Sequence, residues 1–162
     1  MTQITIEYMI MIPILILQIF LFPLTAGWIM TTWTDSRQTL ALQETASHVG
    51  SSIQQVYSAL NHESISAGTV TNRLEIPSFI EGYAYKGNAT LRTTLDPELN
   101  SSKVLEINLR FMGGHIETMT SVTLGQNVEW DLDSAFMSNS TDANLIAEKM
   151  PNGTILMSFE GD

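Results

Sequence analysis

The chain has 162 residues, a formal net charge of −10, seven Lys and Arg, and no cysteine. Its few cations are scattered between Arg37 and Lys149, whereas nucleic-acid binding needs clustered cations that displace phosphate counterions. The lack of cysteine excludes disulfides, thiol catalysis and cysteine-based zinc sites. Beyond an apolar N-terminal stretch, about 130 residues remain, enough for one domain with an ordinary core.

An uncharged stretch, Tyr8–Met30, lies near the start of the chain, with Glu7 immediately before it. A helix rises about 1.5 Å per residue, so this stretch reaches roughly 35 Å and crosses a bilayer core of about 30 Å. No basic residue precedes it, unlike in a secretory signal peptide, so we expect it to remain in the mature protein. Trp28 and Trp33 at its far end are typical of a membrane interface. The sequence predicts a single-pass membrane span.

Two prolines, Pro13 and Pro23, lie inside this span. Each removes a backbone donor and crowds the preceding turn, so each should kink or loosen the helix. Neighbouring helices compensate for such loosening in a membrane. The prolines therefore fit either a helix that packs with other helices or a lone anchor that tolerates them.

Residues 34–62 carry the pattern of an amphipathic helix, with polar side chains on the other faces. Apolar residues recur there with a period of about 3.5 residues, at Leu42, Ala46, Val49, Ile53, Val56 and Leu60. We therefore expect residues 1–62 to form an N-terminal region in which a membrane-spanning helix continues into an amphipathic helix. The apolar seam packs either on the chain's own head domain or on other subunits.

After Asn61 the apolar pattern changes to the period of two that is typical of β-strands. The clearest strand is Leu105–Phe111, followed by a hairpin turn at Gly113-Gly114 and a partner strand from His115 to about Leu124. Further runs predict strands at Val70–Ile76, Tyr83–Tyr85, Thr90–Leu95, Val128–Leu132, Asn144–Glu148 and Ile155–Phe159. About seven or eight short strands indicate an α+β fold in which residues 63–162 form an antiparallel β-sandwich head.

Four N-x-[S/T] sequons lie in the second half of the chain, at Asn88, Asn100, Asn139 and Asn152. Sequons are acceptor sites for N-linked glycans on the outer side of a membrane. Either they are glycosylated, which favours a head outside the cell, or a Ser- and Thr-rich β domain contains them by chance. Arg37, just past the span, gives the opposite and weaker indication under the positive-inside rule. We expect the head to lie outside.

Catalytic patterns are missing from the sequence. His48, His62 and His115 are far apart, and no Gly-x-Ser-x-Gly, phosphate-binding loop or His-Glu-x-x-His motif is present. His115 follows the Gly-Gly turn, where we expect an exposed hairpin histidine. The sequence thus predicts no enzyme activity and no cofactor, and it identifies no small-molecule substrate.

One acidic cluster, Glu129, Asp131 and Asp133, could bind a cation. A period of two places the three carboxylates on one strand face, roughly 6.8 Å apart. Calcium takes oxygen ligands at about 2.4 Å, so a straight strand spaces these acids too widely. A solvated acidic face is the favoured interpretation, and a metal site is the weaker alternative.

The residues Gln3, Thr5 and Glu7, ahead of a long apolar helix, resemble the start of mature class III signal peptide proteins, the type IV pilin-like subunits common in archaea. That family's pattern is Gln, a small hydroxyl residue two positions later, and Glu a further two positions later. Glu7 with Pro13 also resembles the tight-adherence-type minor pilins. The resemblance implies that Glu7 pairs with a neighbouring subunit's free amino terminus, which offsets the cost of drawing a carboxylate into an apolar bundle.

The resemblance implies a pilin-like structural subunit, major or minor, of an archaeal type IV filament or related surface machine. Its partners would be the membrane, other pilin-like subunits and a cell-surface layer, and it would reside in the cell membrane or in an extracellular filament. The family has a basic leader ending in Gly, whereas Met1 and Thr2 precede Gln3 here. This departure favours the alternative, a permanently membrane-anchored β-sandwich module that binds a surface partner, as archaellum stator-like components do.

Overall fold

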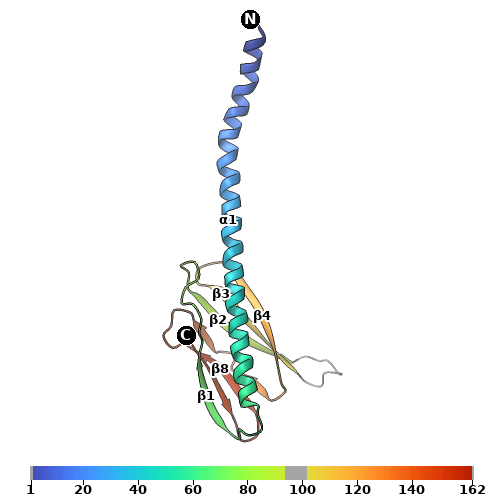
Figure 1. Ribbon diagram of the computed structural model, residues 1–162, viewed down its shortest axis with the longest axis vertical. Helices are drawn as coiled ribbons and strands as arrows, with labels where there is room; N and C mark the ends of the chain where they lie inside the picture. Colours follow the sequence, from blue (N-terminus) through green and yellow to red (C-terminus); the bar gives the residue numbers. More distant parts are fainter. Residues whose placement is uncertain (1, 94–101, 162) are drawn as a thin grey trace. The chain divides into compact units, whose positions relative to one another are not determined.

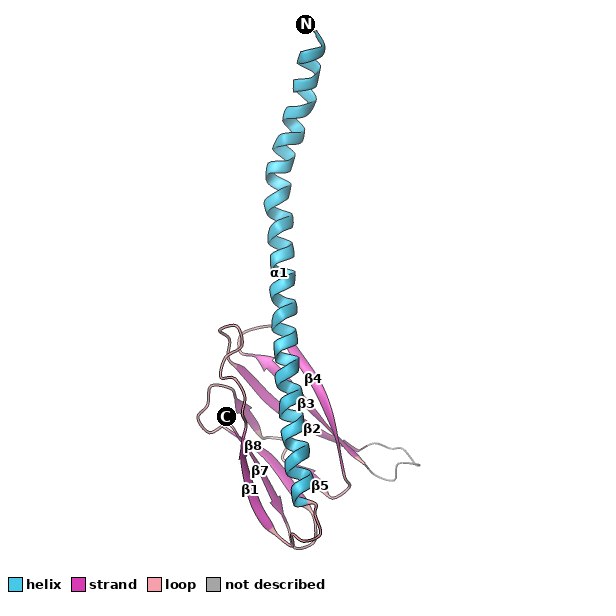
Figure 2. Ribbon diagram, viewed as in Figure 1, coloured by secondary structure: helices cyan, strands magenta, loops and turns pink. Residues whose placement is uncertain are grey.

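The computed structural model describes residues 2–93 and 102–161, with side chains from Met9 onward. One helix, α1 (Thr2–Leu60), precedes eight strands in this part of the chain (Figure 1). The strands, magenta in Figure 2, are β1 (Gly68–Arg73), β2 (Tyr85–Thr93), β3 (Lys103–Phe111), β4 (Glu117–Leu124), β5 (Val128–Trp130), β6 (Ala135–Met137), β7 (Asn144–Lys149) and β8 (Ile155–Glu160). The predicted α+β class, one long helix followed by a β domain, agrees with this order.

The helix α1 is 59 residues long and continues through both Pro13 and Pro23. Its last turn is closed by the Asn61 N–H, which donates to the Tyr57 carbonyl at 2.8 Å. Residues 61–64 then form turns that lead toward β1.

The chain divides into two compact units, residues 1–37 and residues 38–162. The second half of α1 therefore belongs to the same unit as the strands, which we call the head. The sequence analysis instead placed the domain boundary after residue 62, because the helical pattern ends there. Helical periodicity identifies the end of a helix, but not the residues against which the helix packs.

One sheet of the head has the strand order β1-β7-β8-β5. Strand β7 is antiparallel to β1 and to β8, whereas β5 runs parallel to β8, with Val128 beside Ile155 and Trp130 beside Met157. The prediction of an antiparallel head is therefore wrong for this pair. A parallel pair needs a long crossover connection, and residues 131–154, which include β6 and β7, provide it.

The other sheet has the order β4-β3-β2-β6, and its described pairs are all antiparallel. Strand β2 is continuous over nine residues, where the sequence analysis predicted two strands; the end of the second, at Leu95, lies outside the described residues. The short strand β6 was not predicted. It places the Phe136 ring over Gly87 of β2, where any Cβ would collide with that ring.

Strands β3 and β4 form the predicted hairpin, with Arg110 opposite Glu117. Gly113 has a φ of 78°, a conformation that glycine adopts without steric cost. The partner strand begins later than predicted, at Glu117 rather than at His115. The turn takes up the intervening residues because the Phe111 N–H donates to the Ile116 carbonyl at 3.2 Å.

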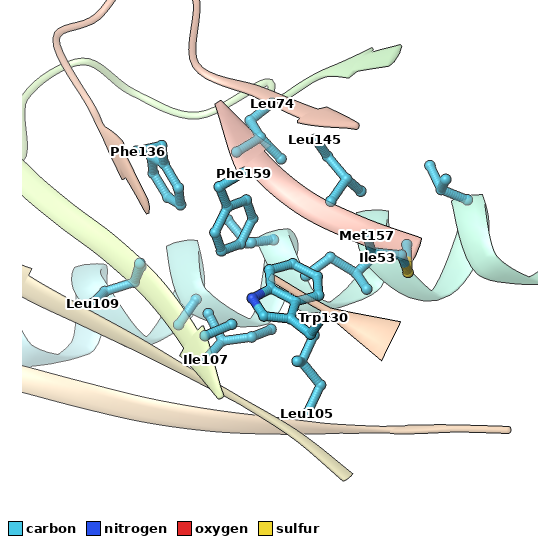
Figure 3. Close-up of a cluster of buried hydrophobic side chains, with 14 of the residues drawn as sticks. Ile53, Leu74, Leu105, Ile107, Leu109, Trp130, Phe136, Leu145, Met157 and Phe159 are labelled. Atoms are coloured by element: carbon cyan, nitrogen blue, oxygen red, sulfur yellow. The ribbon is translucent and has the colours of Figure 1, made fainter. Parts of the chain in front are cut away.

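The core of the head combines side chains from α1 and from both sheets. Figure 3 shows Ile53 of α1, Ile107 of β3 and Phe159 of β8 pointing into one cluster. The predicted apolar seam of α1 is buried throughout, at Leu42, Ala46, Val49, Ile53, Val56 and Leu60. At Gly50 the helix approaches β4 so closely that a Cβ would lie 2.9 Å from Val122 Cγ2. The seam thus packs on the chain's own head.

We expect residues 38–162 to fold without the preceding segment, because the buried seam and all described strands lie within this unit. A fragment that begins at Gln38 should be soluble, should show strand and helix by circular dichroism, and should unfold cooperatively on heating. A matched fragment that begins at Glu63 lacks the seam and should be largely unstructured. An unstructured longer fragment, or equal folding of the two, would contradict this description of the head.

Candidate membrane and assembly segment

The first compact unit carries an uncharged apolar surface, which we call the apolar segment (residues 9–33). Its large apolar side chains, from Met9 to Trp33, are between 48% and 75% exposed. Within the described residues, α1 is the one helix whose length and composition suffice to cross a membrane. A continuous apolar surface of this kind marks contact with lipid or with other proteins. The segment is therefore the main candidate for a functional surface.

Threonine hydroxyls in this segment bond to the helix itself. The Thr25 hydroxyl lies 3.0 Å from both the Leu21 and the Phe22 carbonyl oxygens, and the Thr31 hydroxyl donates to the Gly27 carbonyl at 3.0 Å. A hydroxyl bonded in this way needs no partner from outside the helix. These residues therefore add little polarity to the surface and are compatible with a hydrocarbon environment.

Pro23 interrupts the backbone hydrogen bonds of α1, because proline has no N–H to donate to the Ile19 carbonyl. A shallow groove lies at the same place, lined by Leu15, Gln18, Ile19, Leu21, Phe22, Pro23 and Thr25. The Gln18 amide is the most polar group in this groove. Polar side chains inside apolar helices typically bond across to other helices, so this face is suited to helix packing.

At the end of the segment, the Arg37 guanidinium carbon lies 4.8 Å from the centre of the Trp33 ring. This is a cation–π distance, and both side chains have an apolar body and a polar end. Such residues collect where a membrane helix leaves the hydrocarbon. The pair gives the apolar segment a defined boundary.

The candidate assembly residues Gln3, Thr5 and Glu7 lie in the helical backbone of α1. Their side chains lie outside the described residues, so the pairing of Glu7 with an amino terminus stays a prediction. Pro13 lies within the helix, as predicted.

Three of the four sequon asparagines are exposed, on three different elements. Asn88 lies in β2, Asn139 follows β6, and Asn152 lies in the turn between β7 and β8. The Asn152 side-chain oxygen accepts a hydrogen bond from the Thr154 N–H at 3.0 Å. Asn100 lies outside the described residues. The exposed three are accessible to a modifying enzyme; their occupancy stays a prediction.

The acidic cluster does not lie on one strand face as predicted. Strand β5 ends at Trp130, so Glu129 is in the strand while Asp131 and Asp133 belong to the following turn. The Asp131 carboxylate accepts from the Asp133 N–H at 3.2 Å, an Asx turn that competes with strand pairing. Leu132, predicted to continue the buried alternation, is 65% exposed.

The three histidines lie on different parts of the described chain. His48 lies on α1, and His115 is exposed in the β3–β4 turn, as predicted. His62 follows α1, with its Nδ1 2.8 Å from the Ser64 hydroxyl. In the described part of the chain, no three His, Asp or Glu side chains are placed to hold a metal ion.

A polar joint at the end of α1 was not anticipated from the sequence. The Asn127 side-chain amide donates to the Asn61 side chain at 3.0 Å and to the Gly153 carbonyl at 2.9 Å. The Asn127 side-chain oxygen accepts a hydrogen bond from the Tyr57 hydroxyl at 3.2 Å. One side chain thereby connects α1 with the turns before β5 and before β8.

Lys149 strengthens the same joint from the buried face of β7. It is 8% exposed, and its ammonium donates to the His62 carbonyl at 3.1 Å. A cation beside the carbonyls that follow a helix also interacts favourably with the helix dipole. A sequence signal existed, because Lys149 continues the buried alternation of Leu145 and Ala147.

Tyr85 connects β2 with the segment before it. Its buried hydroxyl donates to the Pro77 carbonyl at 2.7 Å, and its N–H donates to the Ser138 hydroxyl at 2.9 Å. The Ser138 hydroxyl in turn donates to the Ser78 carbonyl at 2.8 Å. Burial disfavours the charged phenolate and so raises the pKa of Tyr85 well above its usual range.

Comparison with models of protein families, with curated protein sequences and with solved structures finds no match for this chain. Function is therefore inferred from the chain's own residues and contacts.

The raised pKa of Tyr85 predicts a loss of head stability in alkali. An unfolded tyrosine loses its proton near pH 10 while the buried one retains it, so the unfolding free energy falls as pH rises above about 10. The slope from one such group is at most about 1.4 kcal/mol per pH unit. Below pH 10 this contribution is fully present.

Denaturant unfolding of the fragment 38–162 between pH 8 and pH 12 measures this slope. Tyr85→Phe should flatten it and should also cost about 0.5–1.5 kcal/mol at neutral pH through the lost hydrogen bond. The control Tyr83→Phe changes a side chain that is 51% exposed and should keep the wild-type slope. Identical slopes for Tyr85→Phe and wild type would refute the assignment.

Proposed function

We propose that this chain is a pilin-like structural subunit, major or minor, of an archaeal type IV filament or a related surface machine. The observation that carries the proposal is the division of α1. Its first part exposes an apolar segment, and its second part is built into a folded head. A subunit of this kind is stored in the membrane and then packs its exposed helix against copies of itself. The chain would be a structural component rather than an enzyme.

The groove around Pro23 supports packing against other helices over a lone anchor. The Ile19 carbonyl lacks the donor that residue 23 supplies in a regular helix, and Gln18 lies in the same groove. In hydrocarbon, unsatisfied polar groups cost several kcal/mol each. A neighbouring helix that brings a donor to this groove removes that cost, which lipid cannot do.

We further propose that the head is a β-sandwich whose two sheets are completed by the amphipathic half of α1. Alternate residues of β3 and β8 are buried, and the α1 seam joins the same core cluster. The six seam positions carry no charge, while Gln, Ser and Glu occupy other helix faces. The head would then be displayed on the filament surface.

The rival function is a permanently anchored module whose head binds a cell-surface layer. It needs the same apolar segment, but no contact between segments of different copies. It is supported by the same division of α1 into an exposed apolar segment and a part that belongs to the folded head. The two functions differ in what they require of Glu7.

The proposed orientation, with the head outside the membrane, can be tested by labelling because the natural chain has no cysteine. Glu129 is exposed in β5, so Glu129→Cys should react with a membrane-impermeant maleimide in intact cells as fully as after lysis. The control Met157→Cys places the thiol at a fully buried position and should react in neither case. Labelling of Glu129→Cys after lysis alone would place the head inside. Glycans on Asn88, Asn139 and Asn152 would lie on the labelled side.

Glu7→Gln tests the filament proposal directly. The change keeps the size of the side chain and removes its charge, so the span should insert as well as in wild type. It removes the ion pair with an incoming subunit's amino terminus. We expect normal membrane levels and a loss of nearly all filaments, counted by electron microscopy.

The matched control is Glu63→Gln, which makes the same chemical change at an exposed position beyond α1. It should leave filament numbers unchanged. Wild-type filament numbers in Glu7→Gln would contradict the pilin-like function and favour the anchored module.

A further inference from the structure

The start of the head is kept close to the end of the apolar segment by the length of the chain between them. The apolar segment ends at Trp33, and the head begins at Gln38. Even when fully extended at about 3.6 Å per residue, the chain from Trp33 to Gln38 spans at most about 18 Å. This limit holds for every arrangement of the two units. Whenever the apolar segment crosses a membrane, the end of the head that contains Gln38 therefore lies at or near the lipid headgroups.

The segment between β1 and β2 extends to this same end of the head. Asn72 of β1 lines a cleft together with Gln55 of α1. Farther along the chain, Ile80 lines a pocket together with Ala41. The segment therefore runs along α1 in the direction of Gln38, and its last part lies where the helix enters the head.

Two turns of the head lie together at this end. In the first, the Ile80 and Tyr83 backbones exchange two hydrogen bonds, of 3.0 and 2.9 Å. The second is the β3–β4 turn, where the Met112 N–H donates to the Ala84 carbonyl at 2.9 Å. The Tyr83 ring also lies 5.9 Å from the Phe111 ring, measured between their centres. These contacts join the two turns into one surface.

The two turns expose three large apolar side chains, which we call the apolar patch (Phe79, Tyr83 and Met112). Phe79 is 57% exposed, Tyr83 is 51% exposed and Met112 is 45% exposed. Clustered apolar side chains on a surface mark a site of contact with lipid or protein. Phenylalanine and tyrosine suit a membrane surface in particular, because their large rings are apolar and the tyrosine hydroxyl remains in water.

The two turns are poor in acids although the chain as a whole is acidic. Its formal net charge is −10, and negative charge is repelled by the anionic lipids of cell membranes. Residues 76–84 contain one acid, Glu81, and residues 111–116 contain none. This surface can therefore approach the headgroups with little of the repulsion that the overall charge would cause.

We propose that the apolar patch inserts into the headgroup layer of the lipid membrane that the apolar segment spans. The proposal rests on the proposed membrane anchoring of the chain. The head would then be held at the membrane by two contacts, the anchor and the patch, and its turns would face the lipid. Movement of the apolar segment from the membrane into a filament would also require the patch to leave the lipid.

The test uses the full-length chain, which has no natural cysteine, reconstituted in phosphatidylcholine vesicles. His115→Cys carries a polarity-sensitive dye at an exposed position in the β3–β4 turn, beside the patch. A nitroxide attached to the lipid headgroups quenches dyes that lie in the headgroup layer. We expect the dye emission to shift to shorter wavelength in vesicles and to lose most of its intensity when the nitroxide lipid is included.

Two further single-cysteine variants separate this proposal from the anchor. Glu129→Cys is exposed in β5, near Asn127, which bonds to Asn61 at the opposite end of the head; its dye should keep its intensity. Met30→Cys reports on the anchor and should be quenched. If the dye at Met30 is quenched and the one at His115 is not, the patch proposal alone is wrong. An unquenched dye at Met30 would overturn both the anchor and the patch.

Two other outcomes would also overturn the proposal. Equal quenching of the dyes at His115 and Glu129 would show that the turns have no particular contact with lipid. A dye at His115 that shifts its emission but is not quenched would be covered by protein rather than by lipid.

A last measurement separates insertion of the patch from the short connection to the anchor, which by itself brings this end near the membrane. Phe79→Ser combined with Met112→Ser should reduce the quenching of the dye at His115 several-fold. Both side chains are exposed, so the thermal transition should be unchanged. The control combines Val70→Ser with Leu132→Ser, which removes apolar side chains that are 40% and 65% exposed outside the patch, and should keep the quenching. Equal quenching in the two double variants would contradict insertion of the patch.

Discussion

Burial of the α1 seam in the head is the constraint on which the rest of the structure depends. The seam positions between Leu42 and Leu60 are 7% exposed or less, and they join a core cluster with both sheets. Each fully buried Leu, Ile or Val contributes about 1.5–3 kcal/mol, so the seam is comparable with the whole net stability of a domain, about 5–15 kcal/mol. The first half of the same helix exposes its apolar side chains. One continuous helix thus meets two environments, and the change falls between Arg37 and Gln38.

Elements with an uninterrupted apolar period could be predicted from the sequence. Strands β3 and β8 and the seam were anticipated because every second residue, or every third or fourth, is apolar and buried. Periodicity identifies a buried face but not a partner, so the parallel pairing of β5 with β8 was missed. Strand β2 was divided in two because Gly87 has no side chain to count. Position 87 requires glycine because a Cβ there would collide with the Phe136 ring, and Phe136 lies far along the chain.

Of the candidate sites, the uncharged span could be predicted from composition, whereas the polar joint at the end of α1 could not. Asn127 acts through bonds to Tyr57, Asn61 and Gly153, which are distant in sequence, and a single asparagine in a turn has no periodic signature. Lys149 could have been found, because a lysine at a position that alternation assigns to the core must find an acceptor. The prediction that the three acids share one strand face was wrong for a local reason. The Asp131 carboxylate accepts a hydrogen bond from the Asp133 N–H, and this turn ends the strand alternation.

The direction of the buried seam has a mechanical consequence. Within the head, the row of seam side chains runs along α1, so tension applied to the helix at Gln38 along its axis acts parallel to this row. To pull the helix out, a force must shear the contacts from Leu42 to Leu60 together instead of breaking them one at a time. At the far end, the hydrogen bonds of Tyr57 and of the Asn61–His62 turn to Asn127 and Lys149 resist the same displacement. Force along the helix axis is thus applied in the direction in which a packed helix is hardest to displace.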